Sequence, residues 1–490
     1  MSPHPGATLP CMKPFRIGAG AGYAGDRIDP AQALAERGGL DALVFECLAE
    51  RTIALAQLRR ARDPAHGYDP MLQARMRAVL PACVRQGVRV ISNMGAANPQ
   101  AAGAAVLAVA REMGLPRLRV AVVTGDDVLD WVRAHDVALL ECPGAQRASA
   151  LGERLISANA YLGAEALLPA LATGADVVIT GRVADPALFL APLMHAFGWR
   201  GDDWPQLGQG VLVGHLLECA AQVSGGYLAD PGHLDVPDLH DVGFPLAEVQ
   251  PDGSAVITKL DGTGGRVDRL SCTAQLLYEI ENPARYLQPD VVADFSRVQL
   301  QELGPNRVRV WGAGGQPRPA QLKATVGYHD GWIGEGQISY GGPGARERGA
   351  LALEVLQHRL QRLGLGAAEQ RAELIGVNAL HGDGRGGISG GISGGISGDG
   401  GGDESGTGLG AGRAANRDAT YTPYEVRARL AVRCASREQA EQVGQEVEAL
   451  YVNGPAAGGG VTQSVREVVA VASALVPREA VQPRVQVMEL

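Results

Sequence analysis

Phe15-Arg-Ile-Gly-Ala-Gly-Ala-Gly-Tyr-Ala-Gly-Asp26 joins a short apolar run to a glycine-rich turn. A helix is expected to follow, because Asp29 is a suitable N-cap residue and Pro30 suits the first helical position. A strand, a glycine loop and a helix in this order are typical of the opening of an α/β domain. Loops of this kind often face a ligand.

Gly20, Gly22 and Gly25 fit the G-x-G-x-x-G pattern of dinucleotide-binding domains, and Glu46 ends the next expected strand, where a ribose-binding acid belongs. In that fingerprint, however, the helix begins within the glycines, whereas here it begins beyond them at Asp29. We therefore disfavour an NAD-dependent oxidoreductase and expect a backbone-lined floor for another ligand. The structural alternative is a tight turn in which glycine supplies a positive φ.

The first half of the chain alternates short apolar segments with amphipathic helical segments such as 70–86 and 99–113. Apolar segments rich in Val, Ile and Leu are typical of strands buried on both faces, and the alternation favours parallel strands joined by crossover helices. The sequence therefore predicts the α/β fold class, with a mostly parallel sheet and crossover helices in the N-terminal half. The expected strands are Arg16–Ala19, Ala42–Glu46, Val88–Ser92, Arg119–Thr124 and Ala175–Thr180.

From Phe295 onward, apolar residues tend to recur at every second position, which predicts antiparallel strands. Helices are expected near 345–363 and 438–450. This order favours an α+β domain, loosely ferredoxin-like. Residues 382–417 carry three consecutive Gly-Gly-Ile-Ser repeats and a Gly/Asp/Ser tract, which predict a flexible insertion. The expected parts are a parallel α/β domain at 13–230 with ligand-facing loops, a loop-rich connection at 231–294 and the α+β domain at 295–490, interrupted by the insertion.

Polar side chains follow each expected parallel strand. The carboxyl ends of parallel strands meet at one edge of a sheet, where α/β proteins bind ligands, so we expect Glu46, Asn93, Asp126 and Arg182 to converge in one pocket. Helix capping accounts for some of this polarity, because prolines follow Asn98 and Asp185. The expected catalytic residues are Glu46, Glu50, Asp126 and His215. The expected substrate-binding residues are Gly20, Gly22, Arg51, Asn93, Asn98, Arg182, Asp185 and Lys259.

Two of these candidates have weaker local signals. Residues 210–226 predict a helix that carries His215. A zinc-binding helix would carry two His at i, i+4 with a Glu between them, and this segment has only one His. No metal is therefore expected. The alternative is a partly buried helix whose polar groups are satisfied. Lys259 precedes a glycine turn and is a candidate for holding a phosphate or carboxylate. It does not form a Walker loop, because there the lysine follows the glycines.

The composition and net charge of the chain limit the classes of partner that it is expected to bind. The chain has 490 residues, a net charge of −9 and no basic block, which argues against nucleic acid as the partner. Its seven cysteines are scattered and form no C-x-x-C pair, so we expect a reducing cytoplasm and neither disulfides nor structural zinc. No apolar run has the length of a membrane span, and residues 1–14 lack an apolar signal core. Either Met1 or Met12 is the start.

Several motifs spread over the chain outside the insertion occur together: Ile17-Gly-Ala-Gly-Ala-Gly, Leu40-Asp-Ala-Leu-Val-Phe-Glu-Cys-Leu-Ala-Glu-Arg-Thr52, Gly67-Tyr-Asp-Pro70, Ser92-Asn-Met-Gly-Ala-Ala-Asn-Pro99, Thr180-Gly-Arg-Val-Ala-Asp-Pro186, Gly214-His-Leu-Leu-Glu-Cys219, Gln275-Leu-Leu-Tyr-Glu-Ile280 and Tyr451-Val-Asn-Gly-Pro455. In these motifs the chain resembles the acyclic terpene utilization (AtuA) family. The resemblance implies a cytoplasmic protein of bacterial catabolism, associated with breakdown of citronellol- and geraniol-type acids through CoA thioesters. It brings no catalytic residues with it.

The resemblance and the polar strand ends together favour an enzyme, a lyase or hydratase that acts on a branched or terpenoid carboxylic acid or its CoA thioester. The alternative is a non-catalytic acyl-CoA-binding or assembly subunit of the same pathway. No cofactor is expected apart from CoA as part of the substrate. We expect a homo-oligomer that binds neither nucleic acid nor membranes. Longer family members append a small C-terminal domain that this chain lacks, so a separate small chain is expected to replace it.

Overall fold

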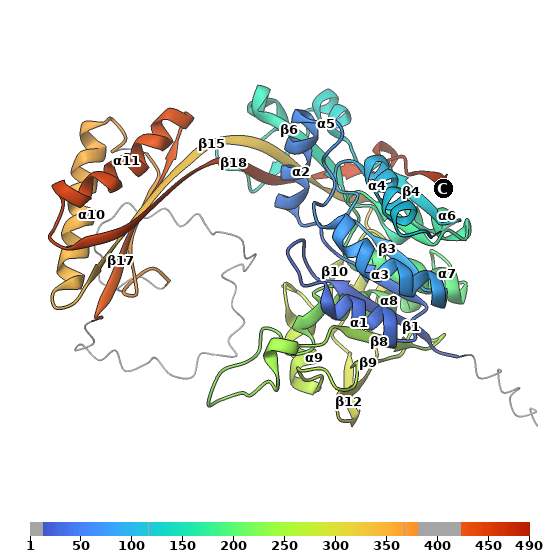
Figure 1. Ribbon diagram of the computed structural model, residues 1–490. Helices are drawn as coiled ribbons and strands as arrows, with labels where there is room; N and C mark the ends of the chain where they lie inside the picture. Colours follow the sequence, from blue (N-terminus) through green and yellow to red (C-terminus); the bar gives the residue numbers. More distant parts are fainter. Residues whose placement is uncertain (1–12, 116, 367, 381–422) are drawn as a thin grey trace, which may run out of the picture. The chain divides into compact units, whose positions relative to one another are not determined.

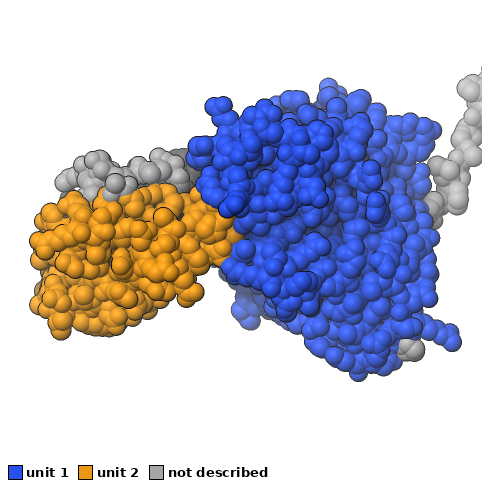
Figure 2. Space-filling model, turned by 90° about the horizontal axis from the view of Figure 1, so that it is seen from above, with its two compact units in different colours: residues 1–328, 471–490 blue, residues 329–470 orange. Residues whose placement is uncertain are grey.

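The computed structural model describes residues 13–115, 117–366, 368–380 and 423–490 (Figure 1). The chain divides into two compact units, one formed by residues 1–328 and 471–490 and the other by residues 329–470 (Figure 2). Strands and helices alternate through the first unit, so the predicted α/β class is confirmed. The expected insertion at 382–417 lies outside the described residues.

A ten-stranded mixed sheet forms the centre of the first unit, with the order β12-β13-β9-β8-β1-β2-β3-β7-β4-β19 among the described residues. Neighbouring strands from β1 to β4 in this order pair in parallel. These are the segments whose apolar runs predict parallel strands, so that prediction is confirmed. Their bounds are β1 (Phe15–Ala21), β2 (Ala42–Phe45), β3 (Arg89–Ser92), β7 (Val177–Thr180) and β4 (Arg119–Thr124).

Helices cover this sheet on both sides (Figure 1). The chain moves outward from β1 through β2 and β3 to β4 and then returns to β7, so right-handed crossovers place the earlier and later helices on opposite faces. The earlier helices, which pack side by side, are α1 (Asp29–Arg37), α3 (Leu72–Gln86) and α4 (Pro99–Glu112). The later ones are α6 (Leu168–Ala172), α7 (Ala187–Phe197) and α8 (Trp204–Leu217). Asp29 lies inside the first turn of α1, not at its N-cap.

Antiparallel strands extend the sheet at both edges. Within 231–294, where the sequence predicts a loop-rich connection, the chain forms two strands of this sheet, and two further strands expected in the second domain join them. Local periodicity cannot reveal these partners, because they are distant in sequence. The added strands are β8 (Pro245–Val249), β9 (Ala255–Lys259), β12 (Gln299–Gly304) and β13 (Arg307–Trp311) beyond β1, and β19 (Arg484–Glu489) beyond β4.

The first unit contains further helices and strands among the described residues. They are α2 (Glu50–Arg62), α5 (Leu129–His135), α9 (Arg269–Leu277), β5 (Leu139–Leu140), β6 (Leu155–Ala160) and a three-stranded sheet of β10 (Tyr286–Leu287), β11 (Val292–Asp294) and β14 (Gly314–Gln316). None of the described helices is long and apolar enough to cross a membrane.

The second unit packs two helices on a sheet around an apolar core. Segments 321–328 and 333–340, which the sequence predicts as separate strands, form one continuous strand, β15 (Gln321–Gly341). The turn-like residues between them do not break it, because β15 pairs with β6 before this point and with β17 after it. The other elements are α10 (Ala345–Arg362), β16 (Gln370–Ile375), β17 (Glu425–Cys434), α11 (Arg437–Asn453) and β18 (Gly458–Pro477).

Gly20, near the end of β1, and Gly22, just after it, allow close packing. Neither Gly20 nor Gly22 has a positive φ, so the alternative of a turn with left-handed glycines does not apply to them. A Cβ on Gly20 would lie 2.7 Å from the ring of Phe45, and one on Gly22 would lie 2.5 Å from the carbonyl carbon of Cys219. Only glycine lets the end of β1 lie directly against Phe45 of β2 and the following loop against the segment after α8.

We expect Gly22→Ala to lower the free energy of unfolding by about 1–3 kcal/mol, because its Cβ would meet backbone atoms that cannot turn away. Gly25→Ala is the matched control in the same loop. Its Cβ would meet only the ring of Tyr23, which is 62% exposed and free to move. Urea unfolding of both variants measures the difference, and equal losses would contradict the packing role of Gly22.

Candidate active site

Glu46 and Asn93 meet at the carboxyl ends of β2 and β3. Asn93 Nδ2 donates to Glu46 Oε1 at 2.9 Å, and the backbone N–H of Leu48 donates to the same oxygen at 2.8 Å. Asn93 Oδ1 in turn accepts the N–H of Cys47 at 2.8 Å. Burial raises the pKa of Glu46 to about 6, although these hydrogen bonds and the charge of Arg182 act to lower it. A buried carboxyl is thus held in a fixed orientation with a pKa near neutral.

Arg182 follows β7 and is only 1% exposed. Its Nη1 donates to Asp185 at 3.1 Å, its guanidinium lies 4.0 Å from the ring centroid of Tyr161, and its Nη2 lies 4.0 Å from Glu50 Oε1. Burial disfavours the charged form, but Asp185, Tyr161 and Glu50 raise the pKa of Arg182 above its usual value. Arg182 is therefore a buried cation that is already engaged by its own neighbours.

Glu50 opens α2 and binds two further groups. The hydroxyl of Tyr161 donates to its carboxylate, and Lys323 Nζ lies 3.1 Å from Oε1. Burial acts to raise the pKa of Glu50, but the charges of Arg182 and Lys323 outweigh it and lower the pKa to about 2. Glu50 is thus an ionised carboxylate at neutral pH, which suits an electrostatic role better than proton transfer.

We expect the stabilisation by Glu50 to depend on pH. Because its pKa is lowered in the folded protein, this stabilisation is fully present above about pH 4.5 and is lost as the pH falls through about 2. Glu50→Gln should therefore lower the melting temperature at pH 7, and the gap to the wild type should close toward pH 2. Glu153→Gln removes an exposed carboxylate as a control. A gap that is constant from pH 7 to pH 3 would contradict this pairing.

Asp126 joins the ends of β4 and β7. Its Oδ2 accepts the backbone N–H of Arg182 at 2.9 Å and Nδ2 of Asn159 at 2.9 Å. Burial raises the pKa of Asp126 to about 6, against the lowering effect of these hydrogen bonds. A Cβ on Gly181 would lie 2.5 Å from Asp126 Oδ1, so the chain approaches this carboxyl closely.

His215 lies at the end of α8, and its Nδ1 is 2.9 Å from Glu218 Oε1. The buried imidazole packs against the rings of Tyr286 and Phe295, with centroids 5.5 and 5.8 Å away. The charge of Glu218 acts to raise the pKa of Glu46. The pair of His215 and Glu218 is therefore close enough to the end of β2 to influence a carboxyl there. The sequence places Glu218 on the same expected helix as His215, but only His215 is among the predicted site residues.

Asp185 completes a group of carboxyls around Arg182. Burial raises the pKa of Asp185 well above its usual value, and Arg182 acts against this shift. The charges of Glu46, Glu218 and Glu50 raise it further. Asp185 nevertheless keeps about a third of its side chain exposed, at 34%, so a ligand in solution can reach it.

The structure therefore brings most of the predicted residues together. Asn93 binds Glu46, the backbone of Arg182 binds Asp126, and the charge of Arg182 acts on Glu46. Glu50, Asp185 and His215 join them through the contacts above. Lys323 of β15 also belongs to this group of residues, although no local sequence pattern indicates it. It reaches Glu50 only because β15 pairs with β6.

Other predicted residues are engaged elsewhere. Lys259 ends β9, which is separated from β1 by β8, and its Nζ donates to the carbonyl oxygen of Thr263 at 2.6 Å. Asn98 accepts the N–H of Ala101 at 3.4 Å as the cap of α4, and its Nδ2 donates to two carbonyl oxygens of the loop before α3. Arg51 lies on the exposed side of α2. Gly20 and Gly22 serve the packing described above.

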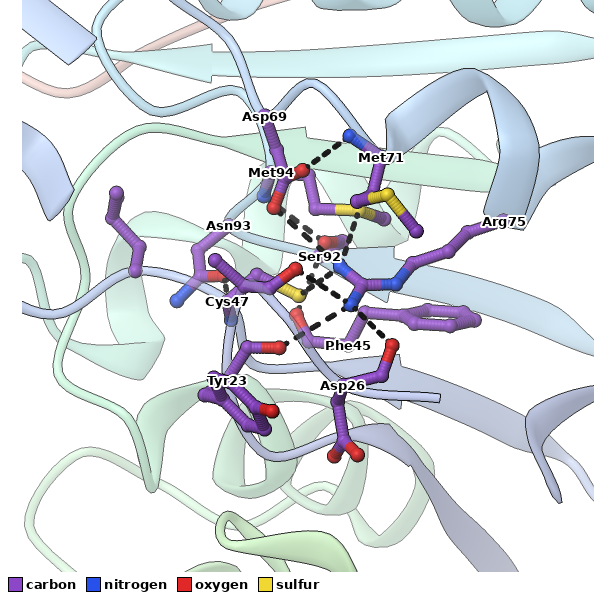
Figure 3. Close-up of polar contacts among 12 residues, drawn as sticks. Tyr23, Asp26, Phe45, Cys47, Asp69, Met71, Arg75, Ser92, Asn93 and Met94 are labelled. Carbon is purple, nitrogen blue, oxygen red and sulfur yellow. Dashed lines mark hydrogen bonds and ion pairs between the residues drawn. The ribbon is translucent and has the colours of Figure 1, made fainter. Parts of the chain in front are cut away.

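Arg75 of α3 is a central residue that sequence reasoning misses (Figure 3). It is fully buried, and its Nη2 donates to the carbonyl oxygens of Tyr23, Ala24 and Asp26 at 3.3, 2.9 and 3.2 Å. A charged residue on a helix is usually solvated, so its sequence context gives no signal. Here Arg75 fixes the glycine loop that follows β1.

The other end of the Arg75 guanidinium reaches two further loops (Figure 3). Its Nη1 donates to Cys47 Sγ at 2.9 Å and lies 3.5 Å from Asp69 Oδ2. Asp69 belongs to the Gly67-Tyr-Asp-Pro70 motif, and its N–H donates to the carbonyl oxygen of Met94 at 2.9 Å. One guanidinium thus ties together the loops after β1 and β2 and, through Asp69, the loop after β3.

Among the described residues, no group of three or more His, Cys, Asp or Glu side chains is placed to hold a metal ion, and the cysteines there are free. Separately, the buried carboxyls of Glu46 and Asp126, whose pKa values are raised to about 6, can exchange protons near neutral pH.

A family model described as acyclic terpene utilisation family protein AtuA matches residues 15–487. No curated protein and no solved structure matches the chain. The match spans nearly the whole chain and agrees with the motifs quoted from the sequence. The chain therefore belongs to the acyclic terpene utilisation family, AtuA.

Proposed function

We propose that this protein is an enzyme of acyclic terpene or branched carboxylic acid catabolism, which acts as a lyase or hydratase on a carboxylic acid or its CoA thioester. Family membership suggests a role in acyclic terpene utilisation. The observation that carries the chemical part is Glu46, a buried carboxyl with a pKa of about 6 at the carboxyl edge of the parallel sheet.

Lyases and hydratases of this kind move a proton at carbon beside a carbonyl group. A carboxyl whose pKa lies near the working pH can both accept and donate that proton. Asn93 and the N–H of Leu48 hold one oxygen of Glu46, which leaves Oε2 for the substrate. The nearby charge of Arg182 keeps the pKa of Glu46 from rising further, so the carboxylate form stays accessible.

Substrate binding would use the exposed groups of the same edge. Lys323 is 46% exposed, and its positive charge can attract a carboxylate or a CoA phosphate. In this proposal CoA enters only as part of the substrate, and the protein is a cytoplasmic homo-oligomer. Its partner is the small-molecule acid or acyl-CoA, with neither nucleic acid nor a membrane involved.

A non-catalytic acyl-CoA-binding or assembly subunit is the second candidate. It is favoured by the mutual pairing of Arg182 with Asp185 and Glu50, since groups that satisfy one another can serve as scaffold. In that case a separate small chain would supply the chemistry.

Turnover of CoA thioesters by the purified protein tests both candidates. Branched 2,3-unsaturated and 3-hydroxy acyl-CoA thioesters are incubated with the protein, and addition or loss of water, or cleavage of the acyl chain, is followed by mass spectrometry. Conversion supports the enzyme. Binding in calorimetry without conversion supports the subunit, and the absence of both would contradict an acyl-CoA ligand altogether.

A further inference from the structure

Beside the carboxyl cluster, three buried polar atoms lack a hydrogen-bond partner among the described residues. They are His215 Nε2, Glu218 Oε2 and Gln275 Oε1. Their side chains are neighbours, because Glu218 contacts the imidazole of His215 and Gln275 Nε2 donates to the carbonyl oxygen of His215 at 2.9 Å. Unpaired buried polar atoms are costly and uncommon, so three of them on neighbouring side chains indicate a polar ligand.

The contacts fix what these atoms can bind. Gln275 uses its NH₂ group toward the backbone, which leaves Oε1 as an acceptor. Nδ1 of His215 faces Glu218 Oε1, and in the imidazole tautomer with its hydrogen on Nδ1 the other ring nitrogen, Nε2, is an acceptor. Glu218 Oε2 can only accept. A hydroxyl group can donate its one hydrogen to such an acceptor, whereas a carbonyl or phosphate oxygen has no hydrogen to donate.

The position of these atoms links them to the proposed site. The charge of Glu218 acts on Glu46 and on Asp185, which lie at the ends of β2 and β7. The loop after β1 lies against the same segment, because a Cβ on Gly22 would meet Cys219. A group bound here therefore lies within electrostatic reach of the carboxyl that carries the proposed chemistry.

We propose that His215, Glu218 and Gln275 form a hydroxyl-binding subsite, which holds the hydroxyl group of a branched 3-hydroxy acyl substrate. The assignment rests on the proposed function and adds the substrate class. His215 Nε2 accepts the hydroxyl hydrogen. Glu218 and Gln275 are positioning residues, because Glu218 sets which imidazole nitrogen carries the hydrogen and Gln275 holds the end of α8.

The first test needs no substrate. Nitrogen-15 NMR of histidine-labelled protein, with the signal assigned by its loss in His215→Asn, should show a neutral imidazole with hydrogen on Nδ1 and none on Nε2. Glu218→Gln offers an amide that can donate to Nδ1, so it should move the hydrogen to Nε2. Glu279→Gln, which removes another charge that acts on His215, should leave it on Nδ1. Hydrogen on Nε2 in the folded wild type would overturn the subsite, whether or not the protein is an enzyme.

The second test compares two thioesters by calorimetry. 3-Hydroxy-3-methylbutanoyl-CoA and 3,3-dimethylbutanoyl-CoA differ only by a hydroxyl in place of a methyl group. The hydroxy compound should bind roughly 10- to 100-fold more tightly to the wild type. Glu218→Gln and Gln275→Leu should abolish this preference, and Glu279→Gln should keep it.

The outcomes separate the two proposals. Equal affinities in the wild type, or a preference that survives in folded Glu218→Gln and Gln275→Leu, would overturn the subsite and leave the proposed function standing. If neither thioester binds to the folded wild type, the proposed acyl-CoA function fails, and the subsite assignment fails with it.

Discussion

Glu46→Gln should preserve the fold and lower the turnover rate by about 10²- to 10⁴-fold once a substrate is identified, as is usual for the loss of a general acid or base. The amide oxygen of glutamine can still accept from Asn93 and from the N–H of Leu48, so the side chain should keep its place. What it loses is the ability to exchange a proton near neutral pH. Steady-state kinetics on the variant and the wild type measure the effect.

Glu46→Gln should also change the stability of the folded protein. The pKa of Glu46 is raised in the folded protein from 4.5 to about 6, so ionisation of this carboxyl destabilises the fold above pH 6, and the penalty disappears below about pH 4.5. Glu46→Gln removes that charge. It should therefore be more stable than the wild type at pH 8, by up to about 2 kcal/mol, and equally stable near pH 4.5.

Asp290→Asn serves as the control for both measurements. Asp290 is equally buried, with a pKa raised to about 6, but it accepts hydrogen bonds from the N–H groups of Ala164 and Glu165. Turnover per folded molecule should be unchanged in this variant. A stable Glu46→Gln protein with full activity would reject the catalytic role, and a variant destabilised at pH 8 with activity in proportion to folded protein would make Glu46 a scaffold residue.

Arg75→Met should lower the free energy of unfolding by about 3–5 kcal/mol. The change leaves the buried carboxylate of Asp69 without its nearest cation and removes donors from the three carbonyl oxygens of the glycine loop. Methionine has a similar length, so the loss reports the missing contacts more than a cavity. Urea unfolding monitored by circular dichroism gives the difference.

Arg77→Met is the matched control on the same helix. Arg77 is 45% exposed and pairs with the exposed Glu112, so its loss should cost less than about 1 kcal/mol. Should Arg75→Met fail to fold, Arg75→Lys keeps the charge but supplies fewer donors, and it should fall between the wild type and the methionine variant. Losses as small as that of Arg77→Met in both Arg75 variants would show that the guanidinium does not hold these loops.

The centre of the fold was predictable because its signal is local. Runs such as Ala42–Phe45 contain only apolar residues, as strands buried on both faces require, and each is followed by polar residues at the carboxyl edge. The flanking strands give no comparable signal. β8 contains Pro245 and Glu248 and pairs with β1, more than 200 residues earlier in sequence, so its place depends on a contact that no window of sequence contains.

The same distinction applies to the candidate site. Glu46, Asn93, Asp126 and Arg182 were recognisable because each follows a strand. Residues that act through long-range pairing were not: Lys323 comes from β15, and Arg75 looks like any solvated arginine on a helix. Gln275 has no distinguishing context until α9 is placed against the end of α8, where its amide binds the backbone of His215.

The pairing of β19 with β4 has a consequence for synthesis of the chain. β4 is complete once Thr124 has been made, but the strand that covers its outer edge begins only at Arg484. At translation rates of roughly 5–20 residues per second, that edge waits about 20–70 s for its partner on the ribosome. An unpaired edge strand is a template for association between nascent chains. Chaperone demand and inclusion-body formation during overexpression should therefore depend on how fast the residues between β4 and β19 are translated.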